Sequence, residues 1–95
     1  MNIFKYYLSE INDLILSHKE DLKLKDLGNL KNVNLEVPPE QFDFDLSCNV
    51  SLVLGKSNKL NPKTLSMQLK NLFESKIKNF DKIEVAGPGF LNIKL

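Results

Sequence analysis

The sequence predicts an α+β fold in which amphipathic helices pack against short strands. Apolar residues recur every three to four positions over residues 2–18 and 62–78, a spacing typical of helices with one buried face. Apolar and polar residues alternate over residues 33–37, 82–86 and 89–95, as in strands that bury one face. No internal repeat or domain boundary interrupts these patterns, which favours one small mixed domain.

Length and composition agree with that class. The 95 residues suffice for one domain, 1–95, and the 42% hydrophobic and 26% charged residues are typical of globular proteins. The single cysteine, Cys48, excludes an internal disulfide, and no Cys or His cluster has the spacing of a metal site. No apolar run approaches the ~20 residues of a membrane span, and no signal peptide is recognisable. We therefore expect a cytoplasmic protein with neither membrane nor metal partners.

The first helix, over residues 2–18, is expected to begin at Asn2, whose side chain can cap it. Its apolar stripe comprises Phe4, Tyr7, Leu8, Ile11, Leu14 and Ile15. His18, the only histidine, follows the stripe, where positive charge favours a helix C-terminus. No Ser or Cys accompanies His18 with the spacing of a catalytic motif, so we assign it to the helix end.

Proline marks two element boundaries. The two prolines that follow residues 33–37 should stop that strand, because proline donates no hydrogen bond to a neighbouring strand. Asn61 before Pro62 is a strong start signal for the helix over residues 62–78. The apolar stripe of this helix and of the residues just after it comprises Leu65, Leu69, Leu72, Phe73, Ile77 and Phe80.

A largely apolar stretch over residues 46–54 predicts a short helix between these elements. Asp45 is expected to cap it and Gly55 to close it. Asp43 and Asp45 also form a carboxylate pair, which could serve acid–base chemistry or a metal. They lack a glycine-rich calcium loop and a nearby histidine, so capping is the simpler assignment.

Residues 89–95 alternate strictly, so their side chains point to opposite faces of a strand. The set expected on the buried face is Leu91, Ile93 and Leu95. The set expected on the other face is Phe90, Asn92 and Lys94. An aromatic ring, an amide and an ammonium in a row suit a surface that stacks on a base, hydrogen-bonds its edge and meets a phosphate. The alternative is that a neighbouring helix covers Phe90, since aromatic residues in strands usually pack.

Charge is distributed unevenly along the chain. Residues 1–50 hold five Lys and nine acidic residues, a balance of −4, while residues 51–95 hold eight Lys and three acidic residues, a balance of +5. The basic half can attract a polyanion while the acidic half faces elsewhere. All basic residues are Lys, which binds phosphate as a point charge and lacks the planar fork that reads guanine. A solvated lysine-rich surface without a partner remains the alternative.

Four runs of the sequence resemble the N-terminal domain of arginyl-tRNA synthetases in their order along the chain. They are residues 33–38, 45–56, 61–62 and 84–93. The most specific part is the Ala-Gly-Pro-Gly-Phe-Leu-Asn sequence over residues 86–92, and the resemblance covers essentially the whole chain. The last residue falls on the expected buried face of a strand, without a polar tail, which is typical of a domain cut from a longer protein.

The resemblance implies an α+β domain, a small antiparallel β-sheet packed with about three to four α-helices, that precedes a catalytic domain. It implies a fragment of an arginine–tRNA ligase that contacts the elbow and D-loop of tRNA(Arg) and orients it for ATP-dependent aminoacylation. The family's reading pair, an aromatic residue and an amide two positions later, falls on Phe90 and Asn92. Gly87, Gly89 and Lys94 complete the residues that we expect to bind tRNA.

The resemblance also implies what the fragment lacks. The His-Ile-Gly-His-like and Lys-Met-Ser-Lys-like motifs of the family are absent from the sequence, as are its catalytic and anticodon-binding domains. We therefore expect no catalytic residue and no cofactor here, with ATP and arginine bound by the parent enzyme. The expected partners are tRNA(Arg) and the remainder of the synthetase chain, and the fragment is expected to be monomeric.

A protein-interaction module is the competing hypothesis. In that case the C-terminal strand would lie at an edge of the sheet and accept a strand from another chain. Salt-sensitive RNA binding would favour the first hypothesis, and salt-insensitive peptide pairing the second. A free-standing enzyme is disfavoured because no nucleophile, base and orienting group occur together.

Overall fold

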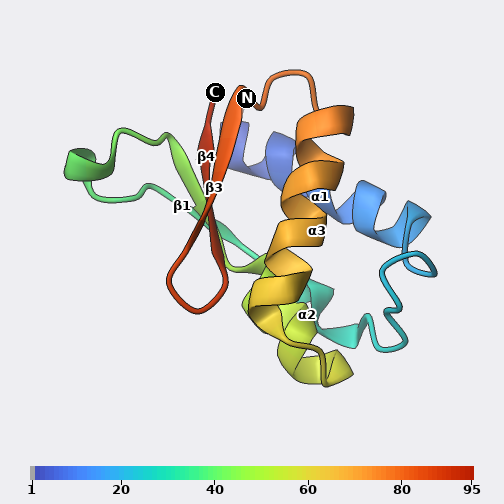
Figure 1. The fold of residues 1–95 in the computed structure, drawn as a ribbon. Helices are drawn as coiled ribbons and strands as arrows, with labels where there is room; N and C mark the ends of the chain where they lie inside the picture. Colours follow the sequence, from blue (N-terminus) through green and yellow to red (C-terminus); the bar gives the residue numbers. More distant parts are fainter. Residues whose placement is uncertain (1) are drawn as a thin grey trace.

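The computed structural model describes residues 2–95 and confirms the α+β class (Figure 1). The helices are α1 (Ile3–Ser17), α2 (Val50–Asn58) and α3 (Pro62–Lys76). The strands are β1 (Leu35–Glu36), β2 (Leu46–Cys48), β3 (Lys82–Ala86) and β4 (Phe90–Lys94). Short 3₁₀ turns occupy Gly28–Asn32 and Glu40–Phe42.

The four strands form one antiparallel sheet in the order β1-β2-β4-β3. The C-terminal strand β4 therefore lies inside the sheet, between β2 and β3. Its register pairs Leu91 with Cys48 on one side and with Val85 on the other. The β3–β4 hairpin turns through residues 87–89, a three-residue loop.

All three helices lie on one side of the sheet, and the segment between β1 and β2 projects to the other side (Figure 1). The helices and the inner face of the sheet share one hydrophobic core. Among its completely enclosed side chains are Ile11, Ile15, Leu54, Leu69, Phe73, Leu91 and Ile93. Both predicted helical stripes thus face the core, as amphipathic helices require.

The predicted starts of the first and last helices are confirmed. The Asn2 side chain accepts hydrogen bonds from the backbone N–H groups of Phe4 and Lys5, and the Asn61 side chain does the same for Lys63 and Thr64. These bonds satisfy N–H groups that have no partner within the helix. His18 ends α1 as expected, with its Nδ1 3.0 Å from the carbonyl oxygen of Leu14.

The prediction of a helix over residues 46–54 is correct only from Val50 onward. Leu46–Cys48 form strand β2, and α2 begins only at Val50 and runs to Asn58. Asp45 does not cap the helix: its Oδ2 accepts the backbone N–H of Leu95 at 2.7 Å, which links the start of β2 to the end of β4. Gly55 does not close the helix either.

Gly55 lies buried within α2, where the next turn of chain passes close to it. A Cβ at this position would stand 3.1 Å from the carbonyl oxygen of Leu60 and 3.3 Å from Pro62. The glycine therefore allows α2 and α3 to approach. Lys59, in a left-handed conformation with φ of 56°, ends α2 instead.

Two strand predictions need smaller corrections. Only Leu35–Glu36 of residues 33–37 pair in the sheet, although the strand does stop before the two prolines. Leu95 was expected on the buried face, but 37% of its surface is exposed because it lies beyond the last paired residue of β4. Leu91 and Ile93 are buried, as expected.

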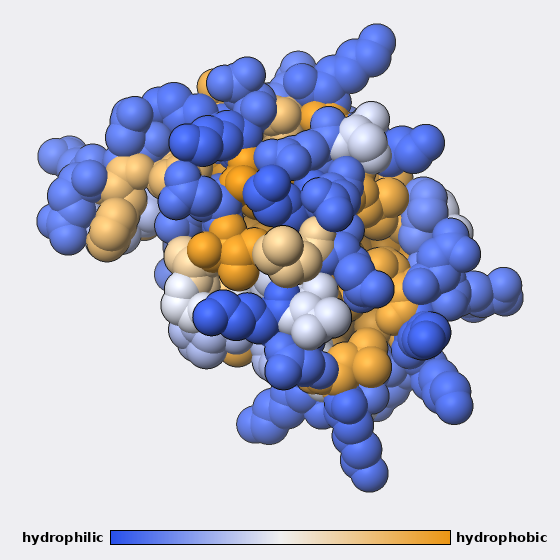
Figure 2. All heavy atoms as spheres, in the orientation of Figure 1, coloured by the Kyte–Doolittle hydropathy of each residue, from blue (hydrophilic) through white to orange (hydrophobic). Residues whose placement is uncertain are grey.

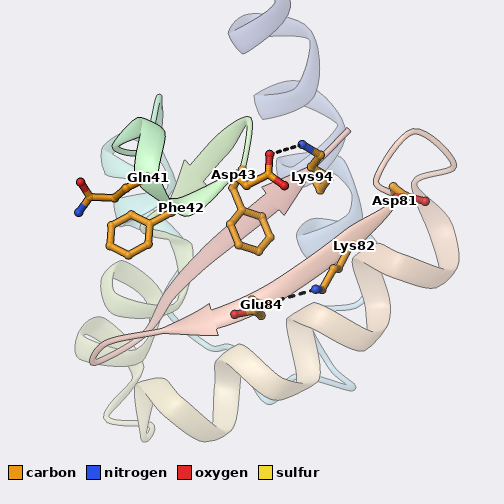
Figure 3. A pocket seen from close by; sticks show the side chains of 8 residues that line it. Gln41, Phe42, Asp43, Asp81, Lys82, Glu84 and Lys94 are labelled. Carbon is orange, nitrogen blue, oxygen red and sulfur yellow. Dashed lines mark hydrogen bonds and ion pairs between the residues drawn. The ribbon is translucent and has the colours of Figure 1, made fainter.

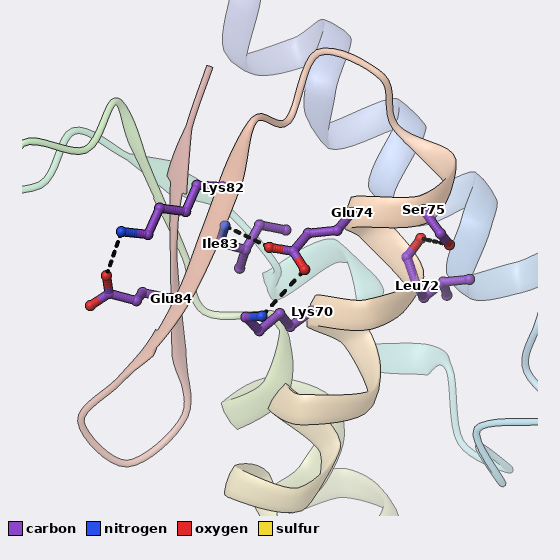
Figure 4. Close-up of polar contacts among 7 residues, drawn as sticks. All are labelled: Lys70, Leu72, Glu74, Ser75, Lys82, Ile83 and Glu84. Carbon is purple, nitrogen blue, oxygen red and sulfur yellow. Dashed lines mark hydrogen bonds and ion pairs between the residues drawn. The ribbon is translucent and has the colours of Figure 1, made fainter.

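A carboxylate ties helix α3 to edge strand β3 (Figure 4). Glu74 Oε2 accepts the backbone N–H of Ile83 at 3.0 Å, and its Oε1 lies 3.3 Å from Lys70 Nζ. An N–H on the outer side of an edge strand otherwise invites pairing with another chain. This contact fixes the hairpin that presents β4.

Candidate nucleic-acid interface

The face of the sheet opposite the helices is open and polar. The strand registers place one side chain from each strand in a row across it: Glu36, Ser47, Asn92 and Glu84. Glu36 and Glu84 are exposed, and Ser47 and Asn92 are half-buried. We call this surface the open face. It holds the side chains of Phe90, Asn92 and Lys94, as the alternation predicted.

Phe90 stands on the open face, and its ring is partly exposed to solvent. Of its surface, 38% is exposed, and the ring lines a hollow of about 290 Å³. Phe42, 50% exposed, lines the same hollow from the projecting segment between β1 and β2. Asn92 and Ser47 also line it. An aromatic ring beside a hollow with an amide in its lining is an arrangement that suits a planar base.

Phe90 also lines a second hollow, of about 280 Å³, shared with Leu52 of α2 and with Asn49. The side-chain amide of Asn49 already has hydrogen-bond partners within the protein. Its Oδ1 accepts the backbone N–H of Asn34 at 2.8 Å, and its Nδ2 donates to the carbonyl of Asn32. The Phe90 ring therefore separates two depressions on the open face. Through these bonds Asn49 holds the backbone just before β1 in place.

The far end of the open face contains paired charges (Figure 3). Lys94 Nζ lies 2.9 Å from Asp43 Oδ1, and Lys82 Nζ lies 3.4 Å from Glu84 Oε2. The hydrogen bond from Lys94 to Asp43 raises the pKa of Lys94, so the ammonium stays charged. A phosphate approaching Lys94 would have to compete with Asp43. These residues surround a hollow of about 530 Å³.

The two glycines of the hairpin loop have different surroundings. Both have positive φ, 55° at Gly87 and 150° at Gly89. A Cβ on Gly87 would meet no atom within 4 Å, whereas a Cβ on Gly89 would stand 2.9 Å from Pro62 Cβ. Gly87 thus borders open space beside the first hollow, and Gly89 packs the hairpin onto the start of α3.

Other chemistries find little support on this surface. Within residues 2–95 no group of three or more His, Cys, Asp or Glu side chains could hold a metal ion. Among the same residues no helix is long and apolar enough to cross a membrane. Cys48 is buried on the inner face, and burial raises the pKa of its thiol to about 12, so it is not a ready nucleophile.

The structure also excludes strand addition through β4. Both sides of β4 are occupied, by β2 and by β3, so the C-terminal strand offers no edge to a partner. The sequence could not reveal this, because strand order depends on pairing between residues far apart in the chain. It also held no sign that Phe42 and Asp43 would meet β4, since both lie in an irregular segment.

Comparison with known proteins points to one family. A family model described as "Arginyl tRNA synthetase N terminal domain" matches residues 9–95. The arginine–tRNA ligase of Pelagibacter ubique (strain HTCC1062) is 40% identical over 94 residues, which make up 99% of this chain and 16% of that protein. The arginine–tRNA ligase of Bartonella bacilliformis is 38% identical over 97 residues, covering 100% of this chain and 16% of that protein. The chain thus spans about 16% of the length of these relatives.

Proposed function

The chain belongs to the family of arginyl-tRNA synthetase N-terminal domains, and on that basis we propose that it is the tRNA-binding part of an arginine–tRNA ligase. It contacts the elbow and D-loop of tRNA(Arg) through the open face. The catalytic and anticodon-binding parts, together with the sites for ATP and arginine, lie outside residues 1–95. The chain alone therefore binds without aminoacylating, and the rest of the synthetase is its second partner.

The observation that supports this proposal is the exposed Phe90 ring beside the Asn92 amide. The ring stacks on an unpaired base of the D-loop, and stacking on an aromatic side chain tolerates any base because every base has a π-face. Discrimination falls to Asn92, whose amide offers both a donor and an acceptor to the base edge. Gly87 leaves room for the nucleotide to approach the hairpin loop.

The contribution to catalysis is positional. Contacts at the elbow of the tRNA are remote from the reacting atoms, so they act by orienting the acceptor end toward the catalytic domain. Binding energy of this kind is used to hold reactants in a productive geometry. Arginine activation that needs no tRNA is accordingly independent of Phe90 and Asn92.

Replacement of Phe90 by alanine tests the proposal. Loss of stacking, about 1–3 kcal/mol, should weaken tRNA(Arg) binding roughly 5- to 150-fold, with little change in thermal stability because the ring is exposed. Asn92→Ala should cost less affinity but flatten the preference among D-loop bases. The measurement is a titration of labelled tRNA(Arg) and of transcripts that differ at single D-loop positions.

Tyr6→Ala is the matched control, since Tyr6 is a 43% exposed aromatic residue on α1, away from the open face. It should leave tRNA affinity unchanged. Equal affinities for wild type and Phe90→Ala would refute the stacking role. A Phe90→Ala variant that unfolds at markedly lower temperature would show that the ring serves the core instead.

A further inference from the structure

Residues 46–73 contain four lysines and not one acidic residue. This stretch includes α2, the turn after it and most of α3. Of its lysines, Lys70 is paired with Glu74 in the next turn of α3. The other three are exposed, and none of them forms an ion pair with a residue in the part of the chain described, 2–95. They are Lys56, Lys59 and Lys63, which we call the corner lysines.

The corner lysines lie beside the hairpin that presents Phe90. Leu52, which lines the second hollow next to the Phe90 ring, is one helical turn before Lys56 on the same face of α2. Pro62, next to Lys63, is the residue on which Gly89 packs. A path over the surface therefore leads from Phe90 past Leu52 to the turn between α2 and α3.

The backbone fixes this corner firmly. The N–H of Leu60 donates to the carbonyl oxygen of Gly55 at 2.9 Å, and Lys59 holds its left-handed conformation between them. Long hydrophilic side chains project from the end of the molecule where α2 and α3 meet (Figure 2). The ammonium groups are therefore carried by long, exposed side chains on a backbone turn that hydrogen bonds hold in place.

The loop before the first 3₁₀ turn brings the carboxylate of Asp26 near the corner lysines. Asn58 accepts the backbone N–H groups of Lys25 and Asp26 and so holds that loop against the corner. Asp26 Oδ1 in turn accepts the N–H of Gly28 at 2.9 Å, and Lys25 and Lys23 add positive charge on this side. The carboxylate of Asp26 is thus accompanied by two lysines and forms no ion pair with a corner lysine.

The open face itself cannot supply much phosphate binding. Its two lysines, Lys82 and Lys94, are both paired with carboxylates. Binding to a nucleic-acid backbone requires lysines that are free to replace its counterions. The corner lysines meet that requirement within reach of the base-binding ring.

We propose that the corner lysines form a phosphate-binding track, which takes the backbone of the tRNA strand that leaves the base stacked on Phe90. The inference rests on the proposed tRNA binding and adds a second site to it. Phe90 and Asn92 hold a base, while Lys56, Lys59 and Lys63 hold consecutive phosphates and fix the direction in which the strand runs. Base contacts specify and phosphate contacts position, so the two sites contribute differently.

The test is the salt dependence of tRNA(Arg) binding. Each phosphate contact adds about 0.7 to 0.9 to the slope of log affinity against log salt. Replacing all three corner lysines together (Lys56→Gln, Lys59→Gln, Lys63→Gln) should weaken binding and reduce the slope by about two to three units. Phe90→Ala should weaken binding with the slope unchanged, since stacking releases no counterions.

The matched control removes the same charge elsewhere: Lys5→Gln, Lys76→Gln and Lys78→Gln together, since Lys76 and Lys78 lie beside the start of α1. Lys76 lies thirteen residues beyond Lys63 along α3, about 20 Å at 1.5 Å per residue, so it cannot share the same phosphates. The control should change the slope by less than one unit. Thermal unfolding of both triple variants establishes that each is folded.

Three results would separate the possible failures. Equal loss of slope in the two triple variants would show that overall charge, and not a track, attracts the tRNA, which overturns the inference. An unchanged slope in the corner variant would overturn it as well, while the effect of Phe90→Ala would leave the proposed function standing. A wild-type chain that does not bind tRNA would overturn the proposed function itself.

Discussion

The two glycines of the hairpin loop differ in the atoms that surround them. Gly87 borders empty space, so its only constraint is a φ of 55°, which L-residues with a Cβ adopt at a cost. Gly89 is constrained twice, by a φ of 150° and by Pro62 Cβ, which would lie 2.9 Å from a methyl group added at this position. A glycine pair that looks symmetric in the sequence thus contains one loop residue and one packing residue.

Gly89→Ala should therefore destabilise the protein more than Gly87→Ala. The first change adds overpacking, typically about 1–3 kcal/mol, to backbone strain of similar size, whereas the second adds only about 1–2 kcal/mol of strain. Chemical denaturation of the two variants measures the difference in the free energy of unfolding. Equal losses would mean that the contact between Gly89 and Pro62 relaxes at no cost.

The segment between β1 and β2 lies outside the sheet but contributes side chains to the open face. It brings Phe42 to the hollow beside Phe90 and Asp43 to Lys94. Asp43 holds a left-handed conformation with φ of 48°, which Asp and Asn tolerate better than other residues with a Cβ. The segment thus places a carboxylate where tRNA binding would favour a cation.

Asp43→Asn should strengthen tRNA binding. The amide keeps the left-handed backbone but releases Lys94, so the salt-dependence slope should grow by about 0.7 to 0.9, the share of one phosphate contact. Titration of tRNA(Arg) at several salt concentrations checks this. An unchanged slope would mean that Lys94 does not meet a phosphate even when its partner is gone.

Which elements could be predicted depended on the kind of pattern. The stripes of α1 and α3 have the helical period and strong caps at Asn2 and Asn61, so the sequence predicted them to within two residues. Residues 46–54 are mostly apolar but follow no single period, and such a short stretch fits a buried strand as well as a helix. There the chain changes from strand to helix at Asn49, a choice made by pairing with β4 rather than by local sequence.

In the candidate site, too, locally determined features could be predicted and long-range contacts could not. Alternation along β4 placed Phe90 and Asn92 on one face correctly, because side-chain direction in a strand is a local property. Whether a helix covered that face depended on the arrangement of the whole fold. The partner of Lys94 is 51 residues away, so its pairing with Asp43 could not be seen in the sequence.

The whole molecule has two unlike sides, since the helices cover only one face of the sheet (Figure 1). Folding energy comes from the covered side, where the large side chains are enclosed. Side chains on the open face contribute little to the core, so their replacement should change stability little. Mutations on the open face should therefore separate binding from stability.

Global stability should also respond to pH through Cys48 on the covered side. Burial raises its pKa from 9.0 to about 12 in the folded protein. Above about pH 9 the unfolded chain loses this proton and the folded protein keeps it, so stability falls with rising pH until about pH 12. Below pH 9 the thiol is protonated in both states and has no effect.

Cys48→Ala should remove this part of the pH dependence. Denaturant unfolding of wild type and variant across pH 7 to about 10 provides the measurement, and their difference in free energy should shrink above pH 9. Parallel curves for the two proteins would show that the thiol ionises equally in both states. The loss of volume at a buried site lowers the variant's stability at every pH and leaves that difference in slope intact.

The interior position of β4 sets the order in which the chain can fold during synthesis. β2 and β3 have no direct pairing with one another and meet only through β4, the last strand to leave the ribosome among those described. The contact between Leu46 and Ile93 closes a loop of nearly the whole second half of the chain, and such nonlocal pairing slows folding. Until Phe90–Lys94 emerges, β2 and β3 each lack the strand that pairs with them, and their inner apolar residues stay exposed. The segment that we propose reads the tRNA is thus also the one that completes the fold, so a chain released before Phe90 would be a target for chaperones and proteases.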